Sequence, residues 1–441
     1  GIEISKGVSI NNSNKLIAFV DKDKNKIGTN IDSIPIISPL KLKDTIKNNN
    51  ISDLLIALPN LDLLKRRKLI NELNNFNIRV KILPSTNTLM LENINVNDFK
   101  NIELNEILDR YITIDLKLLK NEINNQVILI TGAGGSIGSE LTKQIITNEP
   151  KKLILLDHSE INLYKILSEV TESKKNNNLK TTIVPILGSI QNNETIKKLF
   201  TNHEPQLIYH AAAYKHVPLI EENIFEAINN NIIGTLNLIK AFDSIVGKKF
   251  ILISTDKAVR PTNIMGATKR IAELCVQMFA AKYDQKGVNT KFSIVRFGNV
   301  LGSSGSVIPL FIKQIKSGGP ITITHPDVKR YLMTIPEAVN LVLQASNLSN
   351  SGDILVLEMG EQIKIEKLAK KLIKLSGYKP IEIDKKNLIK SDGNIEIKYI
   401  GLRPGEKLYE ELFLGNNLSK TTNPLIHRAR EDHISEKEFD I

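Results

Sequence analysis

The sequence predicts an α/β fold in which a doubly wound parallel sheet forms the main domain and a second, less regular α/β domain precedes it. From residue 126 onward, apolar runs typical of buried strands alternate with helical patterns. The first of these runs ends in a glycine-rich turn, Gly132-Ala133-Gly134-Gly135-Ser136-Ile137-Gly138, and a weaker alternation covers residues 1–105. Strands that alternate with helices indicate crossover connections, which join parallel strands.

The first domain is predicted to be incomplete. Residues 1–5 resemble a helix already under way, so we expect the first strand and its turn to have been removed. No glycine-rich loop occurs in residues 1–105, and we therefore expect no tight dinucleotide binding there. The expected strands lie at 16–21, 53–59 and 78–84, and the expected helix lies at 61–76.

The main domain is predicted to follow a charged connector at 106–125 and to span residues 126–430, with a tail at 431–441. Within it, a smaller substrate-binding lobe is expected mainly at about 297–330 and 355–430. The tail from about residue 415 is polar and weakly patterned. Seven strands are expected, at 127–131, 153–157, 182–187, 207–211, 250–254, 292–297 and near 354–357.

Composition excludes several classes of function. The formal net charge is +11, but the lysines are spread along the chain and form no basic cluster with aromatic residues, so no nucleic-acid binding is expected. The single cysteine, Cys275, lies in an apolar helical pattern and is expected to be buried, which fits a reducing, cytoplasmic setting. No Cys/His spacing suits a metal, and no segment has the length of a membrane span.

The glycine-rich turn predicts a dinucleotide site. Gly132 permits a tight turn, Gly135 lets the backbone approach a pyrophosphate, and Gly138 lets the helix pack closely on the strand. The phosphates would meet the positive end of the helix that follows. Asp157 ends the next strand, where it can accept hydrogen bonds from the adenosine ribose and repel a 2′-phosphate. NAD is therefore favoured over NADP.

From this point the sequence resembles a known family. Residues 131–138 look like the TGxxGxxG loop of short-chain dehydrogenases, and residues 210–218, which begin His-Ala-Ala-Ala-Tyr-Lys-His, resemble the segment that lines the cofactor in that family. Ser254-Thr255-Asp256-Lys257-Ala258 resembles the active-site strand end of the UDP-N-acetylglucosamine 4,6-dehydratases. The runs Arg296-Phe297-Gly298-Asn299-Val300 and Leu402-Arg403-Pro404-Gly405-Glu406-Lys407 are similar to the nucleotide-sugar loops of those dehydratases.

The resemblance implies an extended short-chain dehydrogenase with a Rossmann fold. The expected activity is that of an NAD-dependent hydro-lyase that converts UDP-N-acetylglucosamine to a UDP-4-keto-6-deoxy sugar for bacterial glycan or polysaccharide synthesis. Residues 1–105 resemble the extra Rossmann-like unit of the long, membrane-anchored members. The chain is thus expected to be a cytoplasmic, homo-oligomeric fragment of a protein held in the inner membrane only by a missing N-terminal segment.

One position departs from the short-chain dehydrogenase pattern. The usual YxxxK motif, in which Tyr is the base for the sugar hydroxyl, reads here as Met265-Gly266-Ala267-Thr268-Lys269. Methionine cannot move a proton, although the long dehydratases resemble this chain in having Met there. The base for the C4 hydroxyl therefore stays unassigned. Lys269 lies one helical turn after Met265 and can bind the nicotinamide ribose.

The chemistry of a 4,6-dehydration indicates roles for the strand-end residues. Oxidation of C4 to a ketone acidifies the C5 hydrogen, and elimination then needs a base at C5 and an acid for the C6 hydroxyl. Lys257 is expected to be the base, with a pKa lowered by burial or by Lys269, and Asp256 is expected to be the acid. Thr255 would hydrogen-bond the C4 oxygen. The simpler alternative is a solvent-facing ion pair of Asp256 and Lys257.

Further residues are assigned to binding. Arg403 and Arg330 are candidates for the UDP diphosphate, because a guanidinium matches phosphate oxygens, although arginines also commonly form surface ion pairs. Asn299 and the loop at 302–306 could support the same end of the substrate. The predicted cofactor-binding residues are Gly132, Gly135, Ser136, Ile137, Gly138, Asp157, Ser189, Ile190, Ala211, Ala212, Ala213 and Lys269. The predicted substrate-binding residues are Lys215, His216, Asn299, Arg330, Arg403 and Glu406.

Two other functions stay open at this point. A nucleotide-sugar 4-epimerase shares the fold and the first hydride step, but it would leave Asp256 and Lys257 without a role. A non-catalytic NAD-binding regulator would explain the missing Tyr, but it would not explain why Lys269, Asp256 and Lys257 are all present.

Overall fold

The computed structural model describes residues 15–58, 61, 63–76, 78–82, 100–101, 116–245, 247–303, 305–382, 393–415, 418–431 and 438. The chain forms two compact units, each assembled from separate stretches of sequence. The larger unit contains residues 112–306, 327–364 and 402–441, and the smaller unit contains residues 1–111, 307–326 and 365–401.

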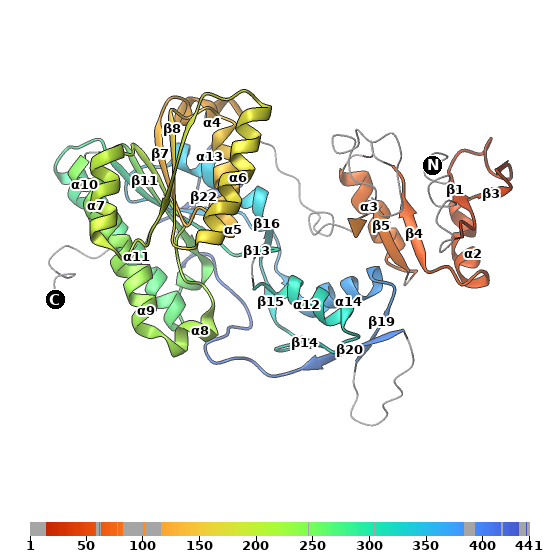
Figure 1. Ribbon diagram of the computed structural model, residues 1–441. Coiled ribbons are helices and arrows are strands. Elements are labelled where there is room, and N and C mark those ends of the chain that lie inside the picture. Colours follow the sequence, from red (N-terminus) through yellow and green to blue (C-terminus); the bar gives the residue numbers. More distant parts are fainter. Residues whose placement is uncertain are drawn as a thin grey trace. The chain divides into compact units, whose positions relative to one another are not determined.

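A nine-stranded sheet forms the centre of the larger unit (Figure 1). Its first seven strands are parallel and correspond to the seven strands predicted from the sequence, while the eighth runs antiparallel to the seventh and the ninth antiparallel to the eighth. In spatial order the strands are β9 (Thr182–Leu187), β8 (Lys152–Asp157), β7 (Val127–Thr131), β10 (Leu207–His210), β11 (Lys249–Thr255), β12 (Lys291–Phe297), β17 (Ile354–Leu357), β22 (Ile426–Ala429) and β21 (Leu418–Lys420).

The strand order reverses between β7 and β10, which are neighbours in the sheet. The chain proceeds from β7 outward through β8 to β9, then returns to β10 and proceeds in the other direction. Open α/β sheets bind ligands at the carboxyl ends of their strands beside such a reversal. Both the predicted cofactor loop and the predicted catalytic residues follow strands of this sheet at that edge.

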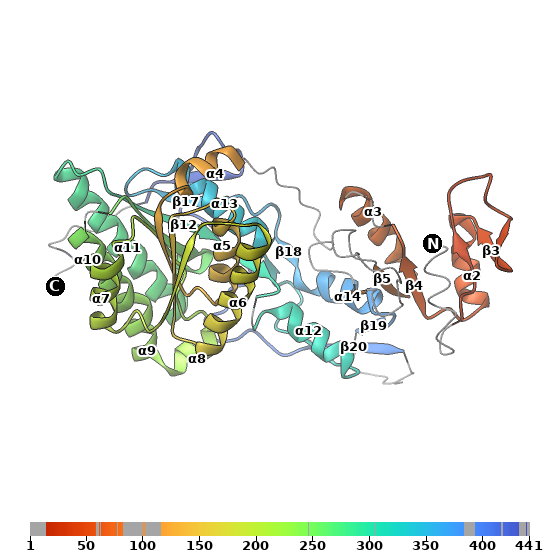
Figure 2. The ribbon, with the colours of Figure 1, turned by 45° about the horizontal axis from the view of Figure 1, so that its top comes forward.

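Helices cover both faces of the sheet, as Figures 1 and 2 show. The π-helix Asn229–Ile233 lies between the helices α9 (Ile224–Ile228) and α10 (Gly234–Ile245) and interrupts that helical segment. Such interruptions are frequent at functional sites. On one face lie α4 (Leu116–Ile123), α5 (Ser136–Ile146), α6 (Glu160–Asn176) and α13 (Ile335–Leu348). On the other lie α7 (Asn193–His203), α10 (Gly234–Ile245) and α11 (Ile264–Gln285), with α8 (Val217–Glu222) and α9 (Ile224–Ile228) beyond them.

The core of this unit is mainly aliphatic, as the low aromatic content requires. Ile128, Leu129 and Ile130 of β7 are fully buried, because a parallel sheet covered on both faces exposes neither side. A small aromatic group supplements them, in which the Phe242 and Phe292 rings meet edge to face at 5.8 Å. Each such large side chain contributes roughly 1.5–3 kcal/mol on burial.

Two segments that appeared unpatterned belong to the larger unit. The predicted connector contains α4, whose Leu119 and Ile123 are buried in the core. The polar tail contributes β22, which pairs antiparallel with β17 and provides hydrogen-bond partners for the backbone groups on the outer edge of that strand. Cys275 of α11 is buried as predicted, and burial raises the pKa of its thiol to about 12.

The described residues of the smaller unit form three small sheets. The predicted helix at 61–76 is present as α3 (Leu63–Leu73), and β1, β4 and β5 lie within the strands predicted at 16–21, 53–59 and 78–84. The expectation for residues 1–5 lies outside the described residues. The remaining bounds are β1 (Phe19–Val20), β2 (Asn30–Ile31), β3 (Ile34–Ile37), α2 (Leu42–Asn48), β4 (Asp53–Ile56), β5 (Arg79–Ile82), β6 (Lys100–Asn101), α12 (Val307–Lys316), β14 (Ile321–Ile323), α14 (Ile365–Leu375), β19 (Lys379–Glu382) and β20 (Asn394–Tyr399).

Candidate active site

The glycine-rich loop forms a tight turn between β7 and α5. Gly132 has a φ of +64°, and a β-carbon there would lie 2.8 Å from the Ala212 backbone. A β-carbon at Gly138 would lie 2.0 Å from the Gly132 carbonyl oxygen. The helix begins at Ser136, and its N-cap residue, Gly135, offers no side chain to the first amides. These amides and the positive helix end form a cradle that suits a pyrophosphate.

Asp157 is buried at the end of β8, beside this loop. Its Oδ2 accepts a hydrogen bond from the Gly134 amide at 2.8 Å, and its Oδ1 accepts one from the Ser159 amide at 2.8 Å. Each carboxylate oxygen has two lone pairs, so both can still accept a ribose hydroxyl. The position of this acid therefore fits the ribose end of NAD.

A buried histidine connects the loop to the next strand. His210 Nδ1 lies 2.7 Å from Thr131 Oγ1, and His210 Nε2 lies 2.9 Å from Thr235 Oγ1. Thr235 donates its own hydrogen to the Asn231 carbonyl, so Nε2 carries the imidazole proton and Thr131 donates to Nδ1. Burial, and secondarily Lys269, lower the pKa of His210 to about 3. The imidazole is thus neutral and holds the ends of β7 and β10 together.

The segment after β10 is held by the π-helix. Asn231 Oδ1 accepts the Tyr214 amide at 2.8 Å, while its Nδ2 donates to the Tyr214 carbonyl and to Thr268 Oγ1. These bonds fix the backbone that follows Ala211, Ala212 and Ala213 and connect it to α11. No local pattern predicted this role of Asn231, because it depends on the π-helical turn.

The other predicted binding positions lie near these elements. Ile190 is buried against Gly234, where a β-carbon would lie 2.6 Å from Ile190 Cδ1, and Ser189 Oγ accepts the Gln191 amide. His216 lies against Gly305, at which a β-carbon would fall 2.3 Å from the imidazole. The structure therefore brings the segment containing the exposed Lys215 together with the predicted loop at 302–306.

The centre of the site is an ion pair at the end of β11. Asp256 begins a short 3₁₀ helix, Asp256–Ala258, and is fully buried. Its Oδ1 accepts hydrogen bonds from Thr255 Oγ1 at 2.9 Å and from Lys257 Nζ at 3.0 Å. Lys257 Nζ also donates to Asn299 Oδ1 at 2.9 Å, just after β12. The pair is thus not the solvent-facing alternative considered above, because Asp256 has no exposed surface.

Two further residues place this centre. Gly266 lets α11 pack on the strand end, since a β-carbon there would lie 2.3 Å from the Lys257 carbonyl oxygen. Lys269 is buried and donates to the Ile253 carbonyl at 2.7 Å, and burial lowers its pKa to about 8. Met265 is buried in a small apolar cluster with Ile220 and Ala227, which is the environment of a packing residue.

An acidic residue that the sequence analysis missed completes the site. Glu410 is buried, and its Oε1 lies 3.6 Å from Lys257 Nζ and 3.9 Å from Arg330 Nε. Thr262 and Asn263 donate to the Gly405 carbonyl and hold this segment against the start of α11. The only sequence signal was its position shortly after the Arg403–Lys407 motif.

The two candidate arginines occupy different environments. Arg330 is buried in β15 (Lys329–Arg330), where its guanidinium donates to Glu406 Oε1 at 2.8 Å and to the Lys329 and Leu408 carbonyls. Arg403 is exposed, and its amide donates to Glu406 Oε2. Of the two, Arg403 has the guanidinium that is accessible to a diphosphate.

Burial and the neighbouring carboxylates have opposite effects on the pKa of Lys257. Burial lowers the pKa of Lys257, but the attraction of Asp256 and Glu410 outweighs it, so the pKa is raised overall. The lowering expected from the sequence was therefore wrong for this arrangement, because two carboxylates surround the amine. Burial raises the pKa of Glu410, with Asp256 adding to the effect and Lys257 opposing it.

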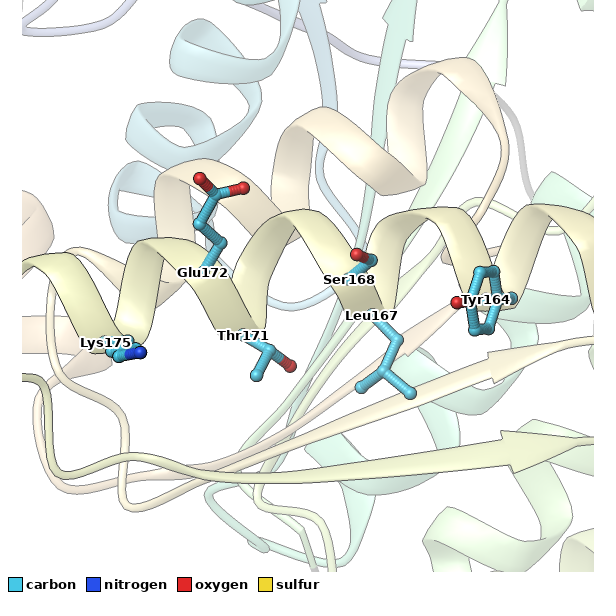
Figure 3. Close-up of a pocket in the computed structure, with 6 residues that line it drawn as sticks. All are labelled: Tyr164, Leu167, Ser168, Thr171, Glu172 and Lys175. Atoms are coloured by element: carbon cyan, nitrogen blue, oxygen red, sulfur yellow. The ribbon is translucent and has the colours of Figure 1, made fainter.

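A separate hollow lies on the outer side of α6 (Figure 3). It contains none of the predicted site residues. Among the described residues, no group of three or more His, Cys, Asp or Glu side chains could hold a metal ion. In the same part of the chain, no helix is long and apolar enough to cross a membrane. The hollow on α6 is lined by Tyr164, Leu167, Ser168, Thr171, Glu172 and Lys175.

Solved structures support the predicted α/β fold with a doubly wound parallel sheet. The X-ray structure of Pen from Bacillus thuringiensis is 31% identical, with a TM-score of 0.59, and the match covers 72% of this chain and 97% of that one. UDP-glucose 4-epimerase from Thermus thermophilus, in complex with NAD, matches at a TM-score of 0.51 and 18% identity, covering 63% and 88%. DesIV, a dTDP-glucose 4,6-dehydratase from Streptomyces venezuelae with NAD and TYD bound, matches at 0.51 and 18%, covering 64% and 86%.

Sequence comparison identifies the family more narrowly. Residues 128–431 match the family described as polysaccharide biosynthesis protein. Capsular polysaccharide biosynthesis protein CapD from Staphylococcus aureus is 42% identical over 96% of this chain and 68% of its own length. Probable polysaccharide biosynthesis protein EpsC from Bacillus subtilis is 41% identical over 93% and 66%. A UDP-glucose 4-epimerase from Rickettsia canadensis is 33% identical over 67% and 80%. The chain belongs to this family of polysaccharide biosynthesis proteins.

Proposed function

We propose that the protein is an NAD-dependent 4,6-dehydratase that converts UDP-N-acetylglucosamine to the UDP-4-keto-6-deoxy sugar. The observation that carries this proposal is the Asp256–Lys257 pair, which lies at the carboxyl end of β11 with an Nζ to Oδ1 distance of 3.0 Å. An acid and a base that lie this close together suit an elimination. The names of CapD and EpsC place relatives in polysaccharide synthesis, which consumes modified nucleotide sugars.

The residues of the loop fit NAD. The three close approaches at Gly132, Gly134 and Gly138 leave no room for a β-carbon, and Gly135 leaves the first amides of α5 without a side-chain acceptor. Asp157 would hold the adenosine ribose, and Lys269 would hold the nicotinamide ribose. When bound, NAD would supply the reversible removal of hydride from C4 and its return to C6.

The chain's own residues would perform the elimination. Once C4 is a ketone, the C5 hydrogen is acidic, and Lys257 in its neutral form would remove it as a proton. The proton released by the C4 hydroxyl on oxidation would reach Asp256, which would pass it to the C6 oxygen, so that the hydroxyl leaves as water. Lys257 would later return a proton to C5. The sugar thus loses one water, and the hydride that leaves C4 ends on C6.

Substrate binding is assigned to the residues beside this centre. The exposed Arg403, with Lys215 and His216, would bind the diphosphate, while Asn299 would hold Lys257 in position as well as contact the sugar. Arg330 would act through Glu406 and Glu410 and not on the diphosphate, since its guanidinium already has three acceptors. We further propose that the full protein is a membrane-anchored homo-oligomer with this part in the cytoplasm.

A nucleotide-sugar 4-epimerase is the second candidate. It is favoured by the Rickettsia canadensis relative, whose name is UDP-glucose 4-epimerase. Both reactions need a group that exchanges a proton with the C4 hydroxyl, so Met265, at the position where short-chain dehydrogenases carry that group, does not separate them. An epimerase has no use for an acid and a base at C5 and C6, so the dehydratase accounts better for Asp256 and Lys257.

Mass spectrometry of UDP-N-acetylglucosamine after incubation with the protein and NAD separates these functions. Loss of one water supports the dehydratase. An isomer of unchanged mass supports the epimerase and contradicts our proposal. Unchanged substrate, in a preparation shown to bind both NAD and the UDP-sugar, would indicate a non-catalytic regulator.

A further inference from the structure

Lys257 is surrounded by more negative than positive groups. We call Asp256, Lys257, Asn299, Arg330 and Glu410 the Lys257 cluster. Lys257 Nζ directs hydrogen bonds to Asp256 Oδ1 and Asn299 Oδ1, and its third neighbour is Glu410 Oε1 at 3.6 Å. Glu406 binds the guanidinium of Arg330 at 2.8 Å. The cluster therefore contains two carboxylates and two cations, and Glu406 adds a carboxylate that is bound to Arg330.

Two carboxylate oxygens of the cluster are buried without a donor among the described residues. These are Asp256 Oδ2 and Glu410 Oε2. Asp256 Oδ2 faces Gly298, at which a β-carbon would lie 3.0 Å from the oxygen. Burying an ionised carboxylate without hydrogen bonds is unfavourable, and protonation removes that cost. Glu410 differs from Asp256 in that no hydroxyl or ammonium group among the described residues lies within hydrogen-bond distance of it.

We propose that Glu410 takes the proton that Lys257 must lose before it can remove the C5 hydrogen. This inference rests on the proposed function. The N–H bond of the ammonium breaks, its electron pair stays on Nζ, and an O–H bond forms on the Glu410 carboxylate. The ion pair becomes a neutral pair, and the total number of protons in the cluster does not change. Glu410 is thus a positioning residue that acts through Lys257.

The geometry permits this transfer with a small movement. A direct N–H···O hydrogen bond needs a separation near 3 Å, so Nζ must approach Oε1 by roughly half an ångström, or one water must bridge them. Bound substrate would exclude water, and a drier environment favours a neutral pair over an ion pair. The raised pKa of Glu410, caused by burial and then by Asp256, is in the direction that the transfer needs.

Other groups of the cluster are less suited to receive the proton. Asp256 Oδ1 already accepts from Thr255 and from Lys257, and this carboxylate is assigned to the proton of the C6 oxygen. Arg330 is a guanidinium and stays protonated at every accessible pH. Glu406 binds the Arg330 guanidinium through Oε1 and accepts the Arg403 amide through Oε2.

The test compares Glu410→Gln with Glu411→Gln as the matched control. Glu411 is the next residue in the chain, but it forms a partly exposed ion pair with Arg260 at 2.8 Å. The measured quantity is the rate at which deuterium from heavy water enters C5 of UDP-N-acetylglucosamine or its product, as a function of pH. Circular dichroism and binding of UDP and NAD show whether each variant is folded and binds its ligands.

With Glu410 present, the pair of Lys257 and Glu410 holds the same number of protons in its active and resting forms. Deuterium exchange at C5 should therefore persist at pH values well below the pKa of a free lysine. In Glu410→Gln, Lys257 must lose its proton to solvent. The ascending limb of the exchange rate plotted against pH should then move to higher pH by at least about one unit. At neutral pH the exchange rate should fall by about tenfold for each unit of this shift, and it should recover in alkaline solution. Glu411→Gln should follow the wild type.

The opposite shift would overturn the proposal. If Glu410 only holds Lys257 in its charged form, removing the carboxylate lowers the pKa of Lys257, and the limb moves to lower pH. An unchanged limb would also contradict it. If Glu410→Gln does not fold, Glu410→Asp provides the test, because a carboxylate withdrawn by one methylene should shift the limb upward by a smaller amount. No exchange and no dehydration by the wild type would instead contradict the proposed function itself.

Discussion

Removing either member of the Asp256–Lys257 pair should stop the elimination, and the structure predicts how the two variants differ. A positioned acid or base contributes about a hundredfold to ten-thousandfold in rate, so Asp256→Asn and Lys257→Ala should each lose at least that much dehydratase activity. The two losses should not add in the double variant, because both groups serve one step. Binding of UDP and NAD should be retained in all three proteins.

The variants should differ in stability because Asp256 is fully buried. Its Oδ1 is 3.0 Å from Lys257 Nζ, which at an effective dielectric constant of about 20 corresponds to an attraction of about 5 kcal/mol before desolvation is counted. Lys257→Ala leaves that carboxylate without its nearest cation and should cost about 3–5 kcal/mol. Adding Asp256→Asn removes the unpaired charge, so the double variant should be more stable than Lys257→Ala alone.

The variants should also differ in proton exchange at C5. Asp256→Asn removes an anion that raises the pKa of Lys257, so the base should be neutral more often and exchange should continue, provided that C4 is still oxidised. Lys257→Ala should not exchange. The assay is NMR of the sugar in heavy water, with thermal melts as the folding control. Exchange by Lys257→Ala at the wild-type rate would refute the assignment of the base, and Thr255 or Asp256 would be the next candidates.

Three further predictions follow from the cofactor side of the site. Calorimetric titration should give tighter binding of NAD than of NADP, and Asp157→Asn should weaken NAD binding by about tenfold to a hundredfold. Tighter binding of NADP would contradict the role of Asp157. The titration should also give one NAD per chain, and two NAD per chain would contradict the prediction that the first domain binds no dinucleotide tightly. Gly138→Ala should abolish measurable NAD binding, since its β-carbon would lie 2.0 Å from the Gly132 carbonyl oxygen, and unchanged affinity would show that this turn does not hold the cofactor. The pKa of His210 is about 3 in the folded protein and 6.5 for an ordinary exposed histidine, so the unfolded chain binds the extra proton and stability falls as pH decreases from about 6.5 towards 3. Between pH 7 and about pH 4.5 the larger unit should lose about 2.5 kcal/mol more in the wild type than in His210→Gln, measured by urea unfolding, and equal losses would refute the buried neutral imidazole.

Local pattern was sufficient for the sheet and for the cofactor loop. The strands β7, β8, β10, β11, β12 and β17 are largely apolar runs, since both faces of a covered parallel sheet are buried, and the runs could be recognised one by one. The glycine spacing required only a strand before it and a helix after it. The role of Asp157 at the ribose could be predicted in the same way, because this residue ends the next strand.

Pattern was insufficient wherever a contact joins distant parts of the chain. Arg296 lies in a motif that resembled a nucleotide-sugar loop, but its guanidinium is fully buried between Glu273 and Glu431. Glu431 lies at the end of the weakly patterned tail, and nothing local indicates its partner. Glu410 reaches Lys257 because the segment after Gly405 is fastened to the start of α11, which is a tertiary arrangement.

The energetics around Lys257 also depended on tertiary contacts. Burial alone predicts a lowered pKa for a lysine, and the sequence analysis used that rule. The result has the opposite sign because Glu410 adds its charge to that of Asp256. A prediction of charge state therefore needed the complete list of neighbours, which the sequence does not contain.

The fate of the C4 hydrogen tests the central claim most directly. UDP-N-acetylglucosamine labelled with deuterium at C4 would be incubated with the protein and NAD in ordinary water, and the product would be analysed by NMR. The dehydratase assignment predicts that the deuterium appears at C6 of a 4-keto-6-deoxy sugar, since the hydride is stored and returned within one active site. Deuterium that remains at C4 of an inverted, still hydroxylated sugar would contradict that assignment and establish the epimerase.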